Sequence, residues 1–321
     1  MFIIVVAGAS MFLGLDAVGS SKLSQAIAII YSGCFFAFAW SQLLEHRPPL
    51  HALPAGESLI TVGFIRLGKT LRELTREYKT VTIFLVGMAF AEAAMTAFTT
   101  IAITYATIVL GMTSMQSSML IGICLVFAVP GSFLFGILTK KIGPFKSYMM
   151  SLCWWAGVTI VAPFFMYSPE TQTAAYFFGM LWGVGFGWLY PTQRTSYTLI
   201  IPAGQESELM GIYIFAGQIL GWMPPLIFTA LNEKGINMKF GLIADACFFL
   251  AALFIMVTFI GVRGFDNAVT LAQASAAKRQ QVMQGAQKRR ESFMLSDDKD
   301  ANALPHTQKN PLPASKLHDR L

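Results

Sequence analysis

Charged residues are scarce in this chain of 321 residues. Asp, Glu, Lys and Arg make up 12% of it, whereas about a quarter of residues are charged in a typical soluble domain. Hydrophobic residues make up 55%, and the mean hydropathy is +0.58. So few charges cannot keep a folded surface in water, which excludes a soluble globular protein. The composition predicts an all-α membrane protein with several spans.

Cysteine and histidine are also rare, with four of each, and neither is spaced for a disulfide framework or a metal site. The cysteines fall inside apolar segments, where a free thiol behaves as a small hydrophobe. No Walker-type phosphate loop occurs, which disfavours an ATP-driven pump. We therefore expect neither an enzyme nor a bound metal or cofactor. The residues concerned are Cys34, Cys124, Cys153, Cys247, His46, His51, His306 and His318.

Seven apolar segments are long enough to cross a membrane, which takes roughly 20 residues for a hydrocarbon core about 30 Å thick. They are residues 23–41, 81–108, 115–138, 147–168, 172–193, 208–231 and 239–262. Residues 1–15 are apolar but too short to span. We interpret them as the end of a span that begins upstream, rather than as a signal peptide, because no basic residue precedes them.

The basic residues predict the orientation of the chain. Twenty of the 23 Lys and Arg lie in residues 42–79, in 139–146, at Arg194 or after residue 262. Because cytoplasmic connections collect Lys and Arg, we expect residues 42–79 and the C-terminal tail to be cytoplasmic. The net charge of +6 follows from this topology, so a nucleic-acid partner is not expected.

The stretch from Tyr190 to Phe228 has the most specific pattern in the chain. It joins two apolar segments through a short polar connection that contains a Pro-Ala-Gly turn. This stretch resembles the autophagy-related vacuole effluxer family, a branch of the major facilitator superfamily of transporters. Where that family commonly carries an Asp-Lys pair, this chain has Gly217 and Gln218. The matching positions are Arg194, Ser196, Tyr197, Ile201, Pro202, Gly204, Glu206, Gly211, Tyr213, Trp222 and Pro225.

The resemblance implies a domain organisation. Residues 81–262 would be the six-helix C-terminal half of a major facilitator fold, and residues 1–41 one or two helices of a truncated N-terminal half. Residues 42–80 would form the cytoplasmic central loop, with an amphipathic helix or a solvated helix stem near residues 59–79. Residues 263–321 are polar and are expected to be largely disordered, with a transient helix at most. The missing N-terminal half is expected to be encoded upstream.

A second motif lies between two apolar segments, in residues 136–146. It resembles the superfamily's short cytoplasmic loop, in which a glycine makes a tight turn and cations hold the helix ends. Gly136, Lys141 and Gly143 match that pattern. Lys140 stands at the position of the aspartate, so the charge relay attributed to that acid is not expected to transfer.

Two acids lie inside apolar segments. Glu92 is near the middle of residues 81–108, and a charge at that depth costs about 2.5–3.5 kcal/mol, so such acids are candidates for substrate or proton coupling. A hydrogen-bonded structural role is the alternative. Asp245 lies about a third of the way into residues 239–262, where a cap or an ion pair with Lys239 is as reasonable as substrate contact.

Charges and prolines at helix ends are the remaining candidates. Arg194 and Glu206 flank the polar connection, and we expect an ion pair that gates or locks two helices, with plain topological charge as the alternative. Breaks in membrane helices often line substrate paths. The proline-rich positions are therefore candidate helix breaks, although structural kinks explain them equally well. They are Pro191, Pro224 and Pro225.

The resemblance implies a function that the residues alone do not. It predicts a secondary transporter in the vacuolar or lysosomal membrane that moves amino acids from the lumen to the cytosol, as in autophagy. A carrier of another small solute is one alternative. A transport-inactive membrane scaffold, whose cytoplasmic loop and tail bind partners, is the other.

Overall fold

The computed structural model describes residues 17–42, 68, 72, 74–203 and 205–303. Within these residues all regular elements are helical, and six helices are long and apolar enough to cross a membrane. The prediction of an all-α membrane protein is confirmed. The elements are α2 (Ala17–Gln42), α4 (Lys79–Ile108), α5 (Ser114–Ile142), α6 (Pro144–Phe165), η1 (Pro169–Thr171), α7 (Gln172–Ile200), α8 (Glu206–Ile219), α9 (Met223–Glu233), α10 (Lys239–Ile255), η2 (Met256–Ile260) and α11 (Gly261–Ala303).

One expected span is a helix but is not among those six. It is α7, which covers the predicted span 172–193 and continues to Ile200. Its sequence is rich in glycine and ends in polar residues such as Gln193 and Arg194, so its mean hydropathy is lower than that of the other spans. The helix lies inside the bundle, where its neighbours rather than lipid cover most of its surface.

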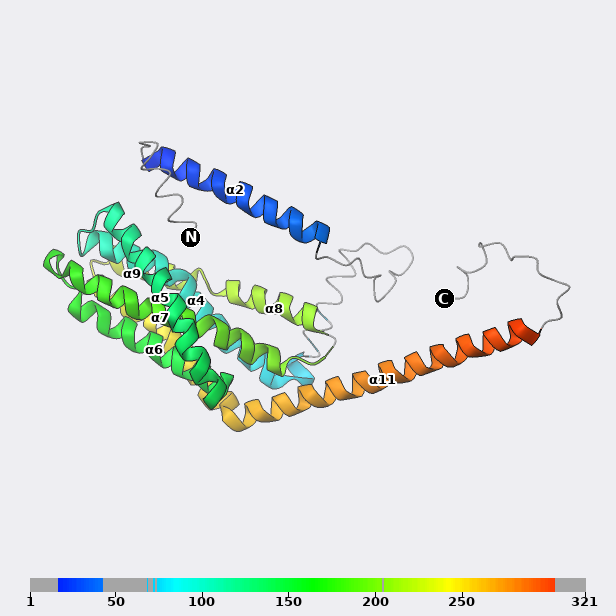
Figure 1. Cartoon of the computed structure of the whole chain (residues 1–321). Helices are drawn as coiled ribbons and strands as arrows, with labels where there is room; N and C mark the ends of the chain where they lie inside the picture. Colours follow the sequence, from blue (N-terminus) through cyan, green and yellow to red (C-terminus); the bar gives the residue numbers. More distant parts are fainter. Residues whose placement is uncertain (1–16, 43–67, 69–71, 73, 204, 304–321) are drawn as a thin grey trace.

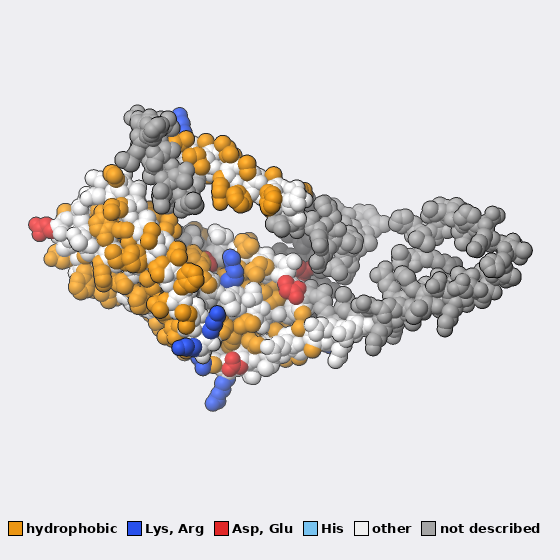
Figure 2. All heavy atoms as spheres, in the orientation of Figure 1, with side chains coloured by type: hydrophobic (Ala, Val, Ile, Leu, Met, Phe, Trp, Pro, Cys, Tyr) orange, Lys and Arg blue, Asp and Glu red, His pale blue; other side chains and the backbone are white. Residues whose placement is uncertain are grey.

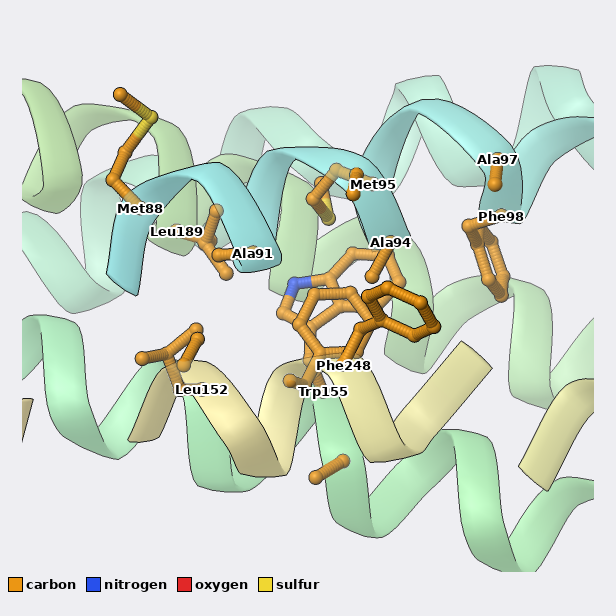
Figure 3. Packing of buried hydrophobic residues seen from close by; sticks show 14 of the residues in the cluster. Met88, Ala91, Ala94, Met95, Ala97, Phe98, Leu152, Trp155, Leu189 and Phe248 are labelled. Carbon is orange, nitrogen blue, oxygen red and sulfur yellow. The ribbon is translucent and has the colours of Figure 1, made fainter. Parts of the chain in front are cut away.

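The helices from α4 to α10 form one bundle (Figure 1). The main pairings are α5 with α7, α4 with α10, and α6 with both α7 and α10. Figure 3 shows part of the core, to which Phe98 of α4, Trp155 of α6 and Phe248 of α10 contribute. Phe98 meets Trp155 edge to face, with 5.0 Å between the ring centroids. In Figure 1, α2 lies apart from the bundle, and its apolar side chains are exposed.

Large apolar side chains cover much of the outer surface of the bundle (Figure 2). A water-exposed protein could not tolerate such a continuous apolar surface, whereas lipid contact requires it. Figure 2 also shows basic side chains grouped near the end of the bundle where α11 begins. On the surface of α5 the exposed apolar residues are Met115, Met119, Leu125, Val126, Val129, Phe133, Leu134 and Ile137.

The connection between α5 and α6 is much shorter than expected from the sequence. Gly136 and Lys141 lie within α5, and the turn consists of Gly143 alone, with φ of 90°. A glycine reaches this backbone conformation without a steric cost, and Pro144 then begins α6. The motif predicted as an eleven-residue loop is therefore the end of one helix, a single-residue turn and the start of the next.

The proline positions differ in their effect. The expected span 208–231 is divided into α8 and α9, and Pro224 and Pro225 occupy the first turn of α9 directly after the break. α7 continues through Pro191, so the expected break is absent there. The first turn of a helix leaves its backbone N–H groups unpaired and accepts proline readily, which explains the two positions in α9.

The contact between α5 and α7 is formed by glycines on one face of α7. We call Gly179, Gly183 and Gly187 the glycine seam. A Cβ atom on Gly183 would lie 2.9 Å from Cys124 Cα, and one on Gly187 would lie 2.7 Å from the Ser132 nitrogen. The two helix backbones are thus in direct contact, as is common where small residues line the interface between membrane helices.

The C-terminal region differs from the sequence expectation. We expected residues 263–321 to be largely disordered, but α11 runs from Gly261 to Ala303 and extends away from the bundle (Figure 1). Its first turns pack on the bundle: Phe265 stacks on Phe145 of α6 at 4.4 Å, and Ala203 N–H donates to Ser275 Oγ. These tertiary contacts hold the first part of α11, up to Ser275, against the bundle.

The predicted amphipathic helix of residues 59–79 lies mostly outside the described residues. Among its described residues, 68, 72 and 74–77 are helical, and Leu74 is buried in the core. The amphipathic helix, with a solvated helix stem as its alternative, stays a prediction for the whole segment.

Candidate functional site

The predicted acid Glu92 lies in the middle of α4 and is hydrogen-bonded. The Gln193 amide nitrogen of α7 donates to Glu92 Oε1 at 2.7 Å. The glutamate is half-buried, whereas the Gln193 side chain is fully buried. An amide donor facing a carboxylate offsets part of the cost of placing an acid inside an apolar bundle.

The same amide nitrogen reaches a third helix. Gln193 Nε2 also donates to the hydroxyl of Tyr213 on α8, at 2.9 Å. Glu92, Gln193 and Tyr213 therefore join α4, α7 and α8 at one point, and we call these three residues the polar junction. Its members are separated by up to 121 positions in the chain, so only the packing of the helices brings them together.

Helical periodicity aligns α7 with α8 along this contact. Tyr197 lies one turn after Gln193, and Leu209 lies one turn before Tyr213. Tyr197 donates its hydroxyl to the Leu209 carbonyl at 2.7 Å, and its ring packs 4.8 Å from the Tyr213 ring. Two successive turns of α7 thus bind two successive turns of α8, which orients the Tyr213 hydroxyl toward Gln193.

A glycine lets α8 approach the acid closely. A Cβ atom on Gly217, one turn after Tyr213, would lie 3.4 Å from Glu92 Cγ and 3.6 Å from Glu92 Cβ. The small residue at this position allows α8 to pack close to the acid of α4.

Arg194 supplies a positive charge beside the polar junction. It is exposed, and its guanidinium interacts electrostatically with the Glu92 carboxylate and with the Tyr213 hydroxyl. Glu206, its predicted partner, lies in the first turn of α8. The gating pair between Arg194 and Glu206 stays a prediction. In the structure, Arg194 also lies close enough to Glu92 of α4 for their charges to attract each other.

A cavity of about 500 Å³ lies between α4, α5 and α7. Aromatic and aliphatic side chains line it, among them Phe98, Trp182, Phe186 and Tyr190. Tyr190 of the cavity lining lies about one turn before Gln193 on α7, so the same helix contributes to the cavity and to the polar junction. A ligand with an apolar part and a polar part would find both environments next to each other.

Asp245, the second predicted acid, has a different environment. It lies on α10 with 1% of its surface exposed, and neither carboxylate oxygen has a hydrogen-bond partner among the described residues. The structure therefore does not bring Asp245 into the hydrogen-bonded cluster of Glu92. The remaining sequence candidates belong to helix ends, turns or helix interiors, as described above: Gly136, Lys141, Gly143, Pro191, Pro224 and Pro225.

In the described part of the chain, no group of three or more His, Cys, Asp or Glu side chains is arranged to hold a metal ion. The polar junction offers one carboxylate, one amide and one phenol. Such groups bind organic solutes and protons through hydrogen bonds and charge.

Two members of the polar junction were not predicted as site residues. Gln193 counted only as the end of an apolar segment, and Tyr213 counted only as part of the family pattern. The sequence did contain a sign that Gln193 is important, because an amide inside an apolar helix needs a polar partner on a neighbouring helix. The sequence does not say which helix that is.

A family model described as "Vacuole effluxer Atg22 like" matches residues 1–268 of the chain. Similar curated proteins are all named Autophagy-related protein 22. The protein from Candida glabrata is 23% identical over 63% of this chain and 37% of its own length. The protein from Kluyveromyces lactis is 24% identical over 64% of this chain and 42% of its own length.

The protein from Cryptococcus neoformans var. neoformans serotype D is 24% identical over 83% of this chain and 49% of its own length. The chain thus spans about half or less of the length of these relatives. No solved structure matches it.

Proposed function

The chain belongs to the vacuole effluxer family, as its sequence pattern predicted, and we propose that it acts in a secondary transporter of the vacuolar membrane. The proposed substrate is an amino acid that leaves the lumen for the cytosol during autophagy. The observation that carries this proposal is the polar junction, in which three helices of a membrane bundle meet at one carboxylate.

The charges around the polar junction suit an amino acid. Its ammonium group requires an acceptor, which Glu92 provides, and its carboxylate requires donors, which Tyr213 and Arg194 provide. The adjoining apolar cavity offers space for a side chain. A solute with one charge would use only half of this arrangement, so the pairing of charges favours a zwitterion.

Uptake into vesicles with a panel of radiolabelled amino acids tests the proposal. Glu92→Gln should abolish uptake while leaving expression intact, because the amide has nearly the same shape but cannot ionise. Glu170→Gln is the matched control, since Glu170 is exposed at η1, outside the polar junction, and its loss should leave uptake unchanged. Normal uptake by Glu92→Gln would remove the carboxylate from the mechanism.

We also propose that α11 and the region after it face the cytoplasm. The uneven distribution of Lys and Arg supports this orientation. Protease added to sealed vacuoles should shorten the protein from its C-terminus without lysis. A C-terminus that is cleaved only after the vacuoles are lysed would reverse the orientation.

A further inference from the structure

The amide of Gln193 is used asymmetrically. Its nitrogen makes both hydrogen bonds, to Glu92 and to Tyr213, whereas its oxygen is buried and has no hydrogen-bond partner among the described residues. Buried amide oxygens are normally paired. This arrangement fits an ionised Glu92, because a carboxylate only accepts hydrogen bonds and so requires the amide nitrogen.

If Glu92 is protonated, the Gln193 amide has to provide a hydrogen-bond acceptor instead of a donor. The protonated carboxyl group carries an O–H donor, which requires an acceptor. A half-turn of the Gln193 amide would place its oxygen where the nitrogen now lies. That oxygen could then accept from the Glu92 carboxyl group and from the Tyr213 hydroxyl, since a phenol both donates and accepts. Both hydrogen bonds would be kept with their direction reversed.

The reversal would change what Tyr213 offers to a substrate. With Glu92 ionised, the Tyr213 oxygen accepts from Gln193, and its hydrogen remains for another acceptor. With Glu92 protonated, that hydrogen would be held by the amide oxygen of Gln193. The charge of Glu92 would thereby determine whether α8 presents a donor to the site.

We propose that Gln193 is a positioning residue that transmits the protonation state of Glu92 to the Tyr213 hydroxyl by reversing its amide. The proton comes from water and binds a carboxylate oxygen of Glu92. A substrate carboxylate that binds the Tyr213 hydroxyl would then compete with that proton. The inference rests on the proposed role of Glu92 in transport, and it adds the group through which a proton and a substrate would be coupled.

Other titratable groups surround Glu92. Arg194 and Tyr190 face it from α7, Tyr148 from α6 and Tyr213 from α8. The other helices packed against α4 carry Cys124 on α5, Glu233 on α9, Asp245 on α10 and Arg263 and Asp266 on α11. A spectral change with pH must therefore be assigned to Glu92 by comparison with Glu92→Gln, because the pH at which the change occurs does not identify the group that titrates.

Vibrational spectra of the purified protein test the inference without a substrate. Infrared difference spectra between wild type and Glu92→Gln follow the Glu92 carboxyl group through a pH titration. Ultraviolet resonance Raman difference spectra between wild type and Tyr213→Phe show whether the phenol donates or accepts. We expect the Tyr213 signal to change at the same pH as the Glu92 carboxyl band.

Gln193→Met separates transmission from a structural role, because methionine has a similar shape and no amide. In this variant Glu92 should still titrate, while the Tyr213 signal should stay constant. In Gln193→Met, a Tyr213 signal that still follows the titration of Glu92 would overturn the inference. In wild type, a Tyr213 signal that stays constant, or a Glu92 carboxyl group that never titrates, would also overturn it. If Gln193→Met does not fold, Gln193→Asn keeps an amide with a shorter reach and should reduce the Tyr213 change.

Uptake of an equimolar mixture of radiolabelled amino acids gives a second measurement. The apparent affinity of wild type should be about tenfold higher at alkaline pH, where the Tyr213 hydroxyl is available as a donor, than at acidic pH. Tenfold is the typical effect of one hydrogen bond to a charged group. In Gln193→Met the affinity should still depend on Glu92 titration, because Glu92 also accepts the substrate ammonium group, but the change should be smaller than in wild type by the contribution of the Tyr213 hydroxyl. Absent uptake by wild type would contradict the proposed function, whereas a pH dependence as large in Gln193→Met as in wild type would contradict only the role of Gln193.

Discussion

The two faces of α7 hold their neighbours in different ways. On one face the glycine seam brings the backbones of α5 and α7 into direct contact. On another face, Gln193 holds α4 and α8 by two hydrogen bonds from one side chain. The first contact leaves no space for an added atom, whereas the second consists of groups that can reorient.

This difference separates a contact suited to stability from one suited to function. Backbone atoms cannot move without moving a whole helix, so the glycine seam fixes the distance between two helices. A side-chain amide can exchange donor for acceptor by one bond rotation, so the polar junction can follow a change of charge. We expect substitutions in the glycine seam to act on folding and substitutions at the polar junction to act on transport.

Gly187→Ala should have the largest effect on stability. The new methyl group would meet the Ser132 nitrogen at 2.7 Å, and the carbonyl oxygen of Ala128 as well, so the helices must move apart. We expect a loss of about 3 kcal/mol in the free energy of unfolding. Thermal unfolding in detergent measures it, with Gly157→Ala of α6 as the control because no atom lies within 4 Å of its added Cβ. A fully stable Gly187→Ala protein would mean that the glycine seam does not hold α5 and α7.

Asp245→Asn should have an intermediate effect, of the opposite sign. The carboxyl group is buried without a hydrogen-bond partner among the described residues, so removing its charge should raise stability by about 1 kcal/mol. Uptake should be retained, because Asp245 lies outside the polar junction. A loss of uptake as complete as that expected for Glu92→Gln would instead add Asp245 to the transport site.

Gly217→Ala should have the smallest effect and sharpens the comparison between the two contacts. Its nearest neighbour is a side-chain atom, Glu92 Cγ, at 3.4 Å from the added Cβ, which is an ordinary packing distance. The change in stability should stay within about 0.5 kcal/mol. Unfolding and uptake are measured in parallel with Gly187→Ala. A large loss of stability in Gly217→Ala would show that the polar junction is packed as tightly as the glycine seam.

Much of the fold follows from local patterns. The predicted spans 81–108 and 115–138 correspond to α4 and α5, and the predicted span 239–262 corresponds to α10 and η2. Apolar length is sufficient for this, because a membrane helix must satisfy its backbone hydrogen bonds within itself. The sequence predicted at most a transient helix in the C-terminal region, where the structure has the long helix α11, whose start packs on α6 through Phe265 and Phe145.

The candidate site was predicted only in part. Glu92 stands out in the sequence because an acid inside an apolar span is costly. Gln193 and Tyr213 do not, since an amide and a phenol are common near the ends of apolar segments. Their importance depends on a contact between α7 and α8 that spans 20 positions, and on a contact between α7 and α4 that spans 101 positions.

By itself the sequence determined that this is an all-α membrane protein, where most of its helices lie, and which family it belongs to. These properties depend on composition, on apolar length and on a local pattern. Only the tertiary structure decided that Gln193 bonds both Glu92 and Tyr213, and that glycines of α7 touch α5. Helical periodicity tells which residues share a face, but the packing of all the helices together decides which faces meet.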